Sequence, residues 1–280
     1  MKISEIPAII LLGGQGTRME NLAYKHILPS KQWLPIGFDK NLEVIPLFWK
    51  SFSVLIKIGV KKFYIIVPPR EIQKILKFFK HKLGEKADIK VINRKLFSEI
   101  DSIQENQDKL QLFFVRSLGK PTVQEILFLK RVLNTPFIVI CADDYFEEEE
   151  TVLIEKVKRF IEGSIEKIEK ENKMGIYSFV KDKAILNKNV QERLLFNLNY
   201  GSQTKKFMIT SLSVYSPRVF EEFVKNKNYH LGEEAQEFIE KGKGDGFVID
   251  VRGFANVNTP EDYKSVLKRN FLNLDTQKFK

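Results

Sequence analysis

The sequence contains few of the residues and patterns that mark several classes of protein. Cysteine occurs once, at Cys141, so no disulfide can form within the chain, and a reducing compartment is expected. No apolar run approaches the ~18–20 residues that a membrane helix needs. The opening segment, residues 1–7, lacks the apolar core and small-residue cleavage site of a secretory signal. The three histidines fall in no catalytic arrangement. These features predict a cytoplasmic protein that does not contact a membrane.

The distribution of charge argues against a nucleic-acid partner. The 46 lysine and arginine residues exceed the 36 acidic residues, which gives a formal net charge of +10. The lysines are spread along the whole chain, whereas the footprint of a nucleic-acid-binding protein is clustered. We therefore expect a solvated, lysine-rich surface and no nucleic acid. Hydrophobic residues make up 43% of the 280 residues, enough to bury a sizeable core.

Strand-like and helix-like segments alternate along the chain, which is typical of a mostly parallel sheet flanked by helices. Apolar residues recur at helical spacing in the intervening segments, for example over 72–83. Two polar stretches, Lys95–Lys109 and Asp182–Lys206, are expected to form loops over a site. No repeat or linker divides the chain, so we predict one domain over residues 1–270 and a tail over 271–280. The expected strands are Ala8–Leu12, Lys62–Val67, Ile89–Asn93, Leu112–Val115, Pro136–Ala142, Gly175–Val180, Met208–Tyr215 and Phe247–Val251.

The first candidate site follows the opening strand. The run Ala8–Leu12 leads directly into the glycine-rich turn Gly13-Gly14-Gln15-Gly16-Thr17-Arg18. Glycines let backbone N–H groups approach an anion, and the Arg18 guanidinium offers a planar set of donors to phosphate oxygens. Lys31 adds a point charge just before Gln32-Trp33-Leu34-Pro35-Ile36. The spacing is neither a dinucleotide fingerprint nor a P-loop. It indicates a site for a nucleoside triphosphate and its pyrophosphate, with an ordinary strand-to-helix turn as the alternative.

The second candidate site follows a central strand. The apolar run Pro136–Ala142 ends in Asp143-Asp144. Ligands of open α/β sheets bind at the carboxyl ends of the strands, and carboxylate oxygens suit Mg²⁺. We therefore predict Mg²⁺ at Asp143, with Asp144 as a second candidate ligand. The alternative is an aspartate that caps the helix after the strand.

Together these motifs resemble the sugar-phosphate nucleotidyltransferases, whose signature is Gly-Gly-x-Gly-Thr-Arg-Leu/Met followed by Pro-Lys-x-Leu/Met-Leu-Pro-Ile. Ser30 replaces the usual proline, and the Lys-Gln-aromatic-Leu form is similar to mannose-1-phosphate guanylyltransferases. The segment Phe254–Tyr263 resembles the element that ends the family's catalytic region. The resemblance implies an α/β fold that is Rossmann-like, three-layered and glycosyltransferase-A-like, with a mostly parallel mixed central sheet. It also implies a nucleotide-binding half over about 1–145 and a sugar- or acceptor-binding half over about 146–270.

The resemblance also implies roles for single residues. Arg18 and Lys31 would contact the triphosphate and stabilise the departing pyrophosphate. Asp143 would hold Mg²⁺, and Asn256 would be the second ligand, at a position where many relatives have aspartate. The Glu-Lys-Pro element that contacts the sugar phosphate in many relatives is absent, and Lys205 and Lys206 are our candidates for that contact. Nucleotide contacts are implied for Leu12, Gly13, Gly14, Gly16, Thr17, Gly119 and Gln124.

From these residues we predict a Mg²⁺-dependent nucleotidyltransferase that forms a nucleotide-sugar and pyrophosphate from a nucleoside triphosphate and a sugar-1-phosphate. The missing Glu-Lys-Pro element leaves two alternatives open. One is cytidylyl or guanylyl transfer to a non-sugar phosphate acceptor. The other is a catalytically weak regulatory homologue that binds nucleotide-sugars, because a fold does not guarantee an activity. The base, the sugar and assembly as a homo-oligomer also stay open.

Overall fold

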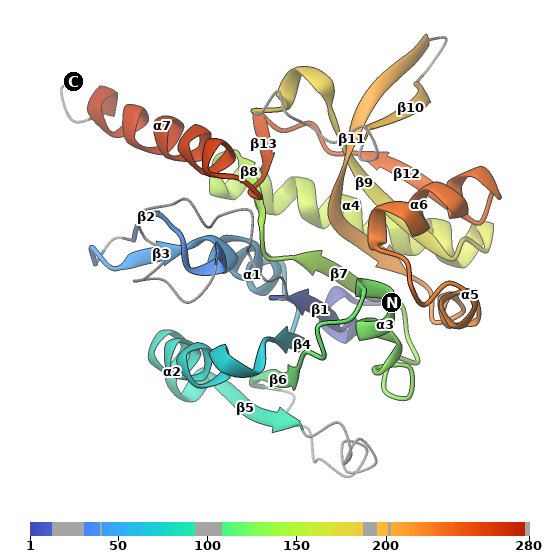
Figure 1. Cartoon of the computed structure of the whole chain (residues 1–280), viewed down its shortest axis with the longest axis horizontal. Helices are drawn as coiled ribbons and strands as arrows, with labels where there is room; N and C mark the ends of the chain where they lie inside the picture. The colour runs from blue at the N-terminus through green and yellow to red at the C-terminus, as the bar shows by residue number, and fades with distance from the viewer. Residues whose placement is uncertain (13–30, 40, 93–107, 187–194, 201–202, 278–280) are drawn as a thin grey trace.

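A nine-stranded sheet runs through the middle of the protein, with helices on both of its faces (Figure 1). The computed structural model describes residues 1–12, 31–39, 41–92, 108–186, 195–200 and 203–277. The strands follow the order β12-β9-β11-β7-β1-β4-β6-β5, and β10 pairs with β11. Strand β11 is antiparallel to β7, β9 and β10, and the other neighbouring pairs of this sheet are parallel. The predicted fold class, an α/β protein with a mostly parallel mixed sheet, is confirmed.

The strands and helices have the following bounds. The central sheet consists of β1 (Ala8–Leu11), β4 (Lys62–Val67), β5 (Ala87–Ile92), β6 (Leu110–Arg116), β7 (Phe137–Cys141), β9 (Gly175–Lys181), β10 (Leu195–Tyr200), β11 (Gln203–Tyr215) and β12 (Gly244–Val248). Two small antiparallel sheets pair β2 (Pro35–Phe38) with β3 (Val44–Pro46), and β8 (Asp144–Glu147) with β13 (Gly253–Asn256). The α-helices are α1 (Leu47–Lys57), α2 (Ile72–Leu83), α3 (Thr122–Leu127), α4 (Glu150–Glu171), α5 (Val219–Lys225), α6 (Leu231–Glu240) and α7 (Pro260–Gln277).

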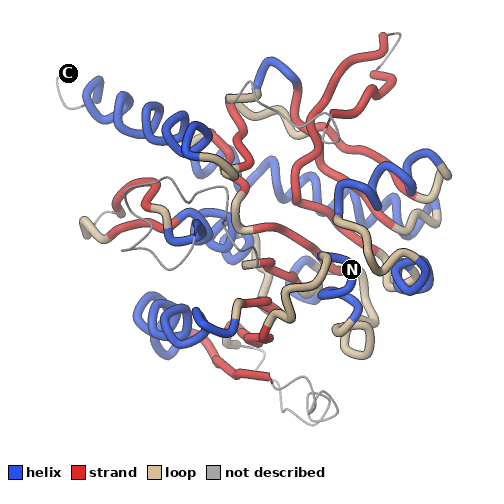
Figure 2. Tube along the Cα trace, viewed as in Figure 1, coloured by secondary structure: helices blue, strands red, loops and turns tan. Residues whose placement is uncertain are grey.

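Helices cover both faces of the sheet because its central strands are apolar on both sides. In β1, Ala8 and Ile10 face the cluster that contains residues of α1, α2 and α4. Ile9 and Leu11 face the opposite cluster, which contains residues of α3, α5 and α6. A parallel strand that is buried on both faces reads as a continuous apolar run, and this run made β1 and β7 recognisable in the sequence. The layers can be followed in Figure 2.

A third, smaller core joins the two short sheets to helix α7. Leu34, Tyr145, Val257 and Tyr263 belong to it and are buried. The Tyr263 hydroxyl donates a hydrogen bond to the carbonyl oxygen of Pro35 at 2.7 Å. This core therefore holds the segment after Lys31, the segment after β7 and the start of α7 together.

The sequence-based boundaries differ from the structure at several elements, of which three bear on the site and the domain limits. The last central strand, β12, begins at Gly244 rather than at Phe247. Part of the stretch 182–206 that we expected as a loop is instead a hairpin, formed by β10 and the first residues of β11. Helix α7 continues into the expected tail, as far as Gln277. Within the described ranges, no helix combines the length and the apolar character needed to cross a membrane.

Candidate functional site

The carboxyl ends of β1 and β7 lie side by side because the two strands are parallel neighbours. Leu12, the residue after β1, is buried and donates its backbone N–H to the carbonyl of Ile66 at 2.9 Å. Asp143 and Asp144 follow β7, and Asp144 opens β8. The predicted phosphate-binding residues Gly13, Gly14, Gly16, Thr17 and Arg18 lie outside the described residues.

Lys31 meets Asp143 at this edge. The Lys31 Nζ donates to Asp143 Oδ2 at 2.5 Å, and the two side chains are only 8% and 17% exposed. Lys31 opens a single 3-10 turn, Lys31–Trp33, that is fixed by its last residue. The Trp33 ring packs edge-on against Phe48 at 5.3 Å between ring centroids. Aromatic packing therefore holds the backbone turn from which the Lys31 side chain extends.

Asp144 is fully enclosed and is held by three donors. The backbone N–H and the hydroxyl of Ser211 both donate to Asp144 Oδ2, at 2.7 and 2.6 Å. The Asn256 Nδ2 donates to Asp144 Oδ1 at 2.7 Å. Ser211 can approach because β11 departs from regular pairing between Ile209 and Ser213. Irregularities of this kind re-aim side chains next to functional sites.

A chain of amides joins the two halves of this cluster. The Asn258 Oδ1 accepts a hydrogen bond from Lys31 Nζ at 2.6 Å. The Asn258 Nδ2 in turn donates to Asn256 Oδ1. The backbone also contributes, since the N–H of Val257 donates to the carbonyl of Asp143 at 2.8 Å. Lys31, Asp143, Asp144, Asn256 and Asn258 thus form one connected polar cluster.

One acceptor of this cluster is left open. Asp143 Oδ1 is buried and has no hydrogen-bond partner within the described ranges. Burial, followed by the charge of Asp143, raises the pKa of the Asp144 carboxyl above its usual range, and the bonds from Ser211 and Asn256 oppose this shift. Among the described residues, no group of three or more His, Cys, Asp or Glu could hold a metal ion by itself. A single open carboxylate oxygen nevertheless fits Mg²⁺, which commonly takes one or two protein carboxylates and completes its shell with phosphate oxygens and water.

Two of the predicted nucleotide contacts, Gly119 and Gln124, lie in the segment between β6 and the end of α3. Gly119 lies in the loop after β6, with φ +67°. The loop is organised by the buried Glu125 carboxylate, which accepts the backbone N–H groups of Leu118 and Lys120 at 2.7 and 3.1 Å. Gln124 lies beside Glu125 on α3 and is half-buried.

The lysines proposed for the sugar phosphate lie on the hairpin of β10 and β11. Lys205 pairs in register with Leu198, and Lys206 pairs with Asn197. The Lys206 side chain is exposed. Because Tyr215 pairs with Phe137 at the start of β7, the earlier residues of β11 extend past the carboxyl end of β7. Both lysines therefore lie at the same edge of the sheet as Asp143, beyond the carboxyl end of β7.

Sequence reasoning missed Ser211 and Asn258. A signal for Ser211 is present, because Thr210-Ser211 interrupts the apolar run of β11 with two polar residues. Asn258 was considered only as part of the segment Phe254–Tyr263. Its role depends on a contact with Lys31, which lies 227 residues earlier in the chain.

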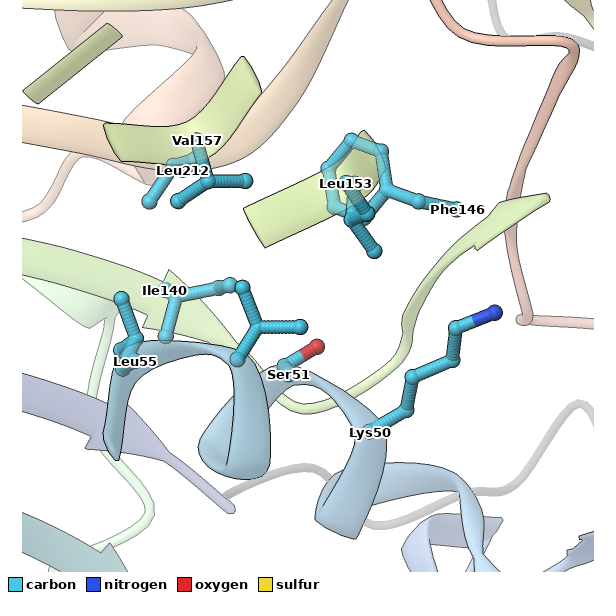
Figure 3. Close-up of a pocket in the computed structure, with 9 residues that line it drawn as sticks. Lys50, Ser51, Leu55, Ile140, Phe146, Leu153, Val157 and Leu212 are labelled. Carbon is cyan, nitrogen blue, oxygen red and sulfur yellow. The ribbon is translucent and has the colours of Figure 1, made fainter. Parts of the chain in front are cut away.

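A small apolar cavity lies behind the cluster, between α1, α4 and the central sheet (Figure 3). Its lining includes Leu55, Ile140 and Leu212, with Lys50 at one side. The Lys50 Nζ lies 4.3 Å from the centre of the Tyr145 ring. Burial lowers the pKa of Lys50 to about 8. With this apolar lining the cavity does not suit a polyphosphate, so we place the candidate site at the polar cluster.

Comparison with solved structures places this cluster in a known fold. No protein-family model matches the chain, and no curated protein sequence matches it. A candidate glucose-1-phosphate thymidylyltransferase from Bacillus anthracis, in complex with sucrose, superposes with a TM-score of 0.65 at 13% identity and covers 95% of each chain. An inositol-1-phosphate CTP transferase from T. maritima gives 0.60 at 14% identity, over 96% of this chain and 97% of that one. An apo UDP-glucose pyrophosphorylase gives 0.59 at 16% identity, over 96% and 98%.

The chain has the fold of the sugar-phosphate nucleotidyltransferases, and the predicted resemblance is confirmed at that level. At these identities the likeness concerns the fold alone, and activity has to be argued from the site.

Proposed function

We propose that this protein is a Mg²⁺-dependent nucleotidyltransferase. It would form a nucleotide-sugar and pyrophosphate from a nucleoside triphosphate and a sugar-1-phosphate. The observation that carries the proposal is the convergence of Lys31 with Asp143 at the carboxyl edge of a sheet whose fold is shared with three proteins named for such reactions. Ligands of open α/β sheets bind at this edge.

The reaction asks for positioned charge rather than for a protein nucleophile. An oxygen of the acceptor phosphate attacks the α-phosphorus in line, and the bond from that phosphorus to the pyrophosphate breaks. Negative charge grows on the departing oxygens, and a fixed cation stabilises it. The Lys31 ammonium has three N–H donors, of which two are used by Asp143 and Asn258 within the described part of the chain. The third can be donated to a phosphate oxygen.

Asp143 is the residue that would hold Mg²⁺, through its open Oδ1. The cation would neutralise phosphate charge and leave the chain to orient the reactants. Asn256 presents its Oδ1 to Asn258 rather than to open space, so we place it second as a candidate ligand. Both carboxylate oxygens of Asp144 already accept hydrogen bonds, from Ser211 and Asn256. Arg18 keeps the role that its motif implies.

The acceptor class follows less directly from the site. The three structural neighbours are named for glucose-1-phosphate, inositol-1-phosphate and UDP-glucose. The neighbour named as an inositol-1-phosphate CTP transferase is the reason to retain the alternative of a non-sugar phosphate acceptor with CTP. Lys205 and Lys206 are our candidates for binding the acceptor phosphate, since their strand extends past the carboxyl end of β7.

The test is a matrix of four nucleoside triphosphates against hexose-1-phosphates and inositol-1-phosphate, read by pyrophosphate release with and without Mg²⁺. We expect one productive combination, which requires Mg²⁺. In that combination Arg18→Ala, Lys31→Ala and Asp143→Asn should each lower the rate about 10²–10³-fold. Full activity in all three variants would refute the assignment, and nucleotide-sugar binding without turnover would favour the regulatory alternative.

Matched controls are available at the opposite edge of the sheet. Lys225 lies on α5, which follows the end of β11 that pairs with the start of β7, and its Nζ contacts Glu222 at 2.8 Å. Asp88 lies near the start of β5 and pairs with Lys109 at 3.8 Å. Lys225→Ala and Asp88→Asn remove the same kinds of charge and should leave pyrophosphate release unchanged.

A further inference from the structure

Asn258 uses its backbone and its side chain for separate purposes. Its N–H donates to Asp262 Oδ2 at 2.8 Å, as does the N–H of Thr259 at 2.7 Å. Asp262 N–H donates back to the Thr259 hydroxyl at 3.2 Å, which completes the cap at the start of α7. The helix start therefore needs the backbone of Asn258 but not its amide side chain. That side chain points instead to Lys31 and Asn256.

The hydrogen bonds around this side chain can run in only one direction. An ammonium group only donates, so Asn258 must turn its oxygen toward Lys31. Its nitrogen then faces Asn256, which must accept with its own oxygen. The Asn256 nitrogen is left to donate to Asp144, whose carboxylate accepts. A donor at one end and an acceptor at the other thus fix the orientation of both amides.

The Asp144 end of this series of hydrogen bonds is held independently of Lys31. Asp144 Oδ2 accepts two hydrogen bonds from Ser211, and the Ser211 hydroxyl oxygen accepts the backbone N–H of Cys141 at 2.8 Å. The relay from Lys31 to Asp144 therefore connects the segment after the first motif to β7, β8, β11 and β13.

A lysine needs such an arrangement if its charge is to stay in one place. Its four-carbon chain is flexible, and holding it costs side-chain entropy. Asp143 alone supplies one contact, to which the ammonium could be bound from many directions. Asn258 Oδ1, at 2.6 Å from Lys31 Nζ, supplies a second contact from a different element. The Lys31 side chain is only 8% exposed. Two acceptors on two elements define where the Nζ lies.

We propose that Asn258 is a positioning residue that fixes the Lys31 ammonium between two acceptors at the site. The effect on catalysis rests on the proposed function, whereas the effect on the ammonium does not. Asn258 would not touch the attacking oxygen or the α-phosphorus, and it would act on catalysis only through Lys31.

The first experiment observes the ammonium directly, without nucleotide or metal. Proton–nitrogen correlation spectra of ¹⁵N-labelled protein detect lysine NH₃⁺ groups whose exchange with water is slow. A Lys31→Arg variant identifies the Lys31 signal by its loss. We expect that signal in the wild type, with exchange about 10- to 100-fold faster in Asn258→Ala, as loss of a hydrogen bond to a charged group implies. Asn258→Asp keeps an acceptor for Lys31 and should retain slow exchange.

The matched control is Asn226→Ala. Asn226 donates its amide to Glu237 at 3.0 Å on the other side of the fold, just after α5. The Asn226→Ala variant also loses a side-chain hydrogen bond, so it tests whether any such loss alters the Lys31 signal. We expect the Lys31 signal to stay unchanged in this variant. A Lys31 signal missing in the wild type, or equally slow exchange in Asn258→Ala, would overturn the proposal.

The second experiment measures pyrophosphate release in a double-mutant cycle of Asn258→Ala and Lys31→Ala. The single Asn258 change should lower kcat about 10- to 100-fold, because misplacing a charged group by about 1 Å has effects of this size. In the Lys31→Ala background it should cause no further loss, whereas a merely structural role would lower the rate in both backgrounds. If neither the wild type nor any variant releases pyrophosphate, the proposed function fails. The ammonium spectra alone then decide the role of Asn258.

Discussion

Glu234 provides a direct test of how burial controls charge in this protein. It lies on α6, is fully buried, and accepts hydrogen bonds from the hydroxyls of Tyr177 on β9 and Tyr215 on β11, the latter at 3.0 Å. Burial raises the pKa of the Glu234 carboxyl from 4.5 to about 8, and the two tyrosine hydroxyls oppose the shift. The group should therefore be largely protonated at neutral pH in the folded protein and ionised in the unfolded chain.

The sign of the pH dependence follows from these two pKa values. Between pH 4.5 and about 8, the folded state keeps a proton that the unfolded chain has released. Raising the pH through this window therefore lowers the free energy of unfolding. The contribution is fully present below pH 4.5 and is lost as the pH passes the folded-state pKa. At about 1.4 kcal/mol per pKa unit, the loss from this one group approaches about 5 kcal/mol, as large as the net stability of many domains.

The assay is urea unfolding of the wild type and Glu234→Gln at pH 5 to 9. Glutamine has almost the same shape and cannot ionise, so the pH dependence due to Glu234 disappears. We expect the variant to gain about 3–4 kcal/mol relative to the wild type between pH 5 and 8. Glu240→Gln, at an exposed position of the same helix, is the control, and its difference from the wild type should stay constant. A difference for Glu234→Gln that changes by less than about 1 kcal/mol over this range would refute the reasoning.

Two further predictions concern the surroundings of the polar cluster. Lys50→Met should raise the free energy of unfolding at pH 7 by about 1–3 kcal/mol, because burial lowers the Lys50 pKa to about 8 and methionine carries no charge. The wild type should also gain stability between pH 8 and 10.5, where the unfolded chain binds the extra proton, and a less stable variant in thermal unfolding would show that the contact with Tyr145 dominates. Ser211→Ala removes the hydroxyl donor from the buried Asp144 and should lower stability by about 1–3 kcal/mol in urea unfolding, with reduced pyrophosphate release. An unchanged midpoint would mean that the backbone N–H of residue 211 suffices.

The central strands could be predicted from the sequence because burial on both faces leaves a continuous apolar run. Lys62–Val67 was located to the residue, and β1 and β7 to within one residue at each end. The short strands β2, β3, β8 and β13 could not be predicted in this way. Each has only three or four residues, and each is held by tertiary packing in the small third core rather than by its own pattern. In β10 the apolar residues Phe196, Leu198 and Tyr200 alternate with asparagines, but the asparagine-rich composition of the surrounding stretch led us to expect a loop.

The candidate site was predictable where its chemistry is carried by a local motif. Lys31 and Asp143 were each identified from their neighbours in the sequence, and they meet in the structure at 2.5 Å. Ser211 and Asn258 were missed because nothing near them in the sequence refers to their partners. The contact of Ser211 with Asp144 depends on an irregularity in the pairing of β11. Such a feature follows from the fit of neighbouring strands and cannot be read from spacing.

The polar cluster is assembled from parts of the chain that are far apart in the sequence. Its members come from the turn before β2, the junction of β7 and β8, and the end of β13 with the residues just after it, and Ser211 in the middle of β11 holds Asp144. They therefore meet only when the sheet and the third core are complete. Buried polar groups are costly unless their partners are present, and nearly every group here has one. Among the five residues of the cluster, the buried side-chain oxygen without a hydrogen-bond partner in the described part of the chain is Asp143 Oδ1, which lies beside the Lys31 ammonium with its third N–H donor. A ligand that offers both a cation and an acceptor oxygen, such as a metal-bound phosphate, satisfies both groups at once, whereas a ligand that offers either alone satisfies one.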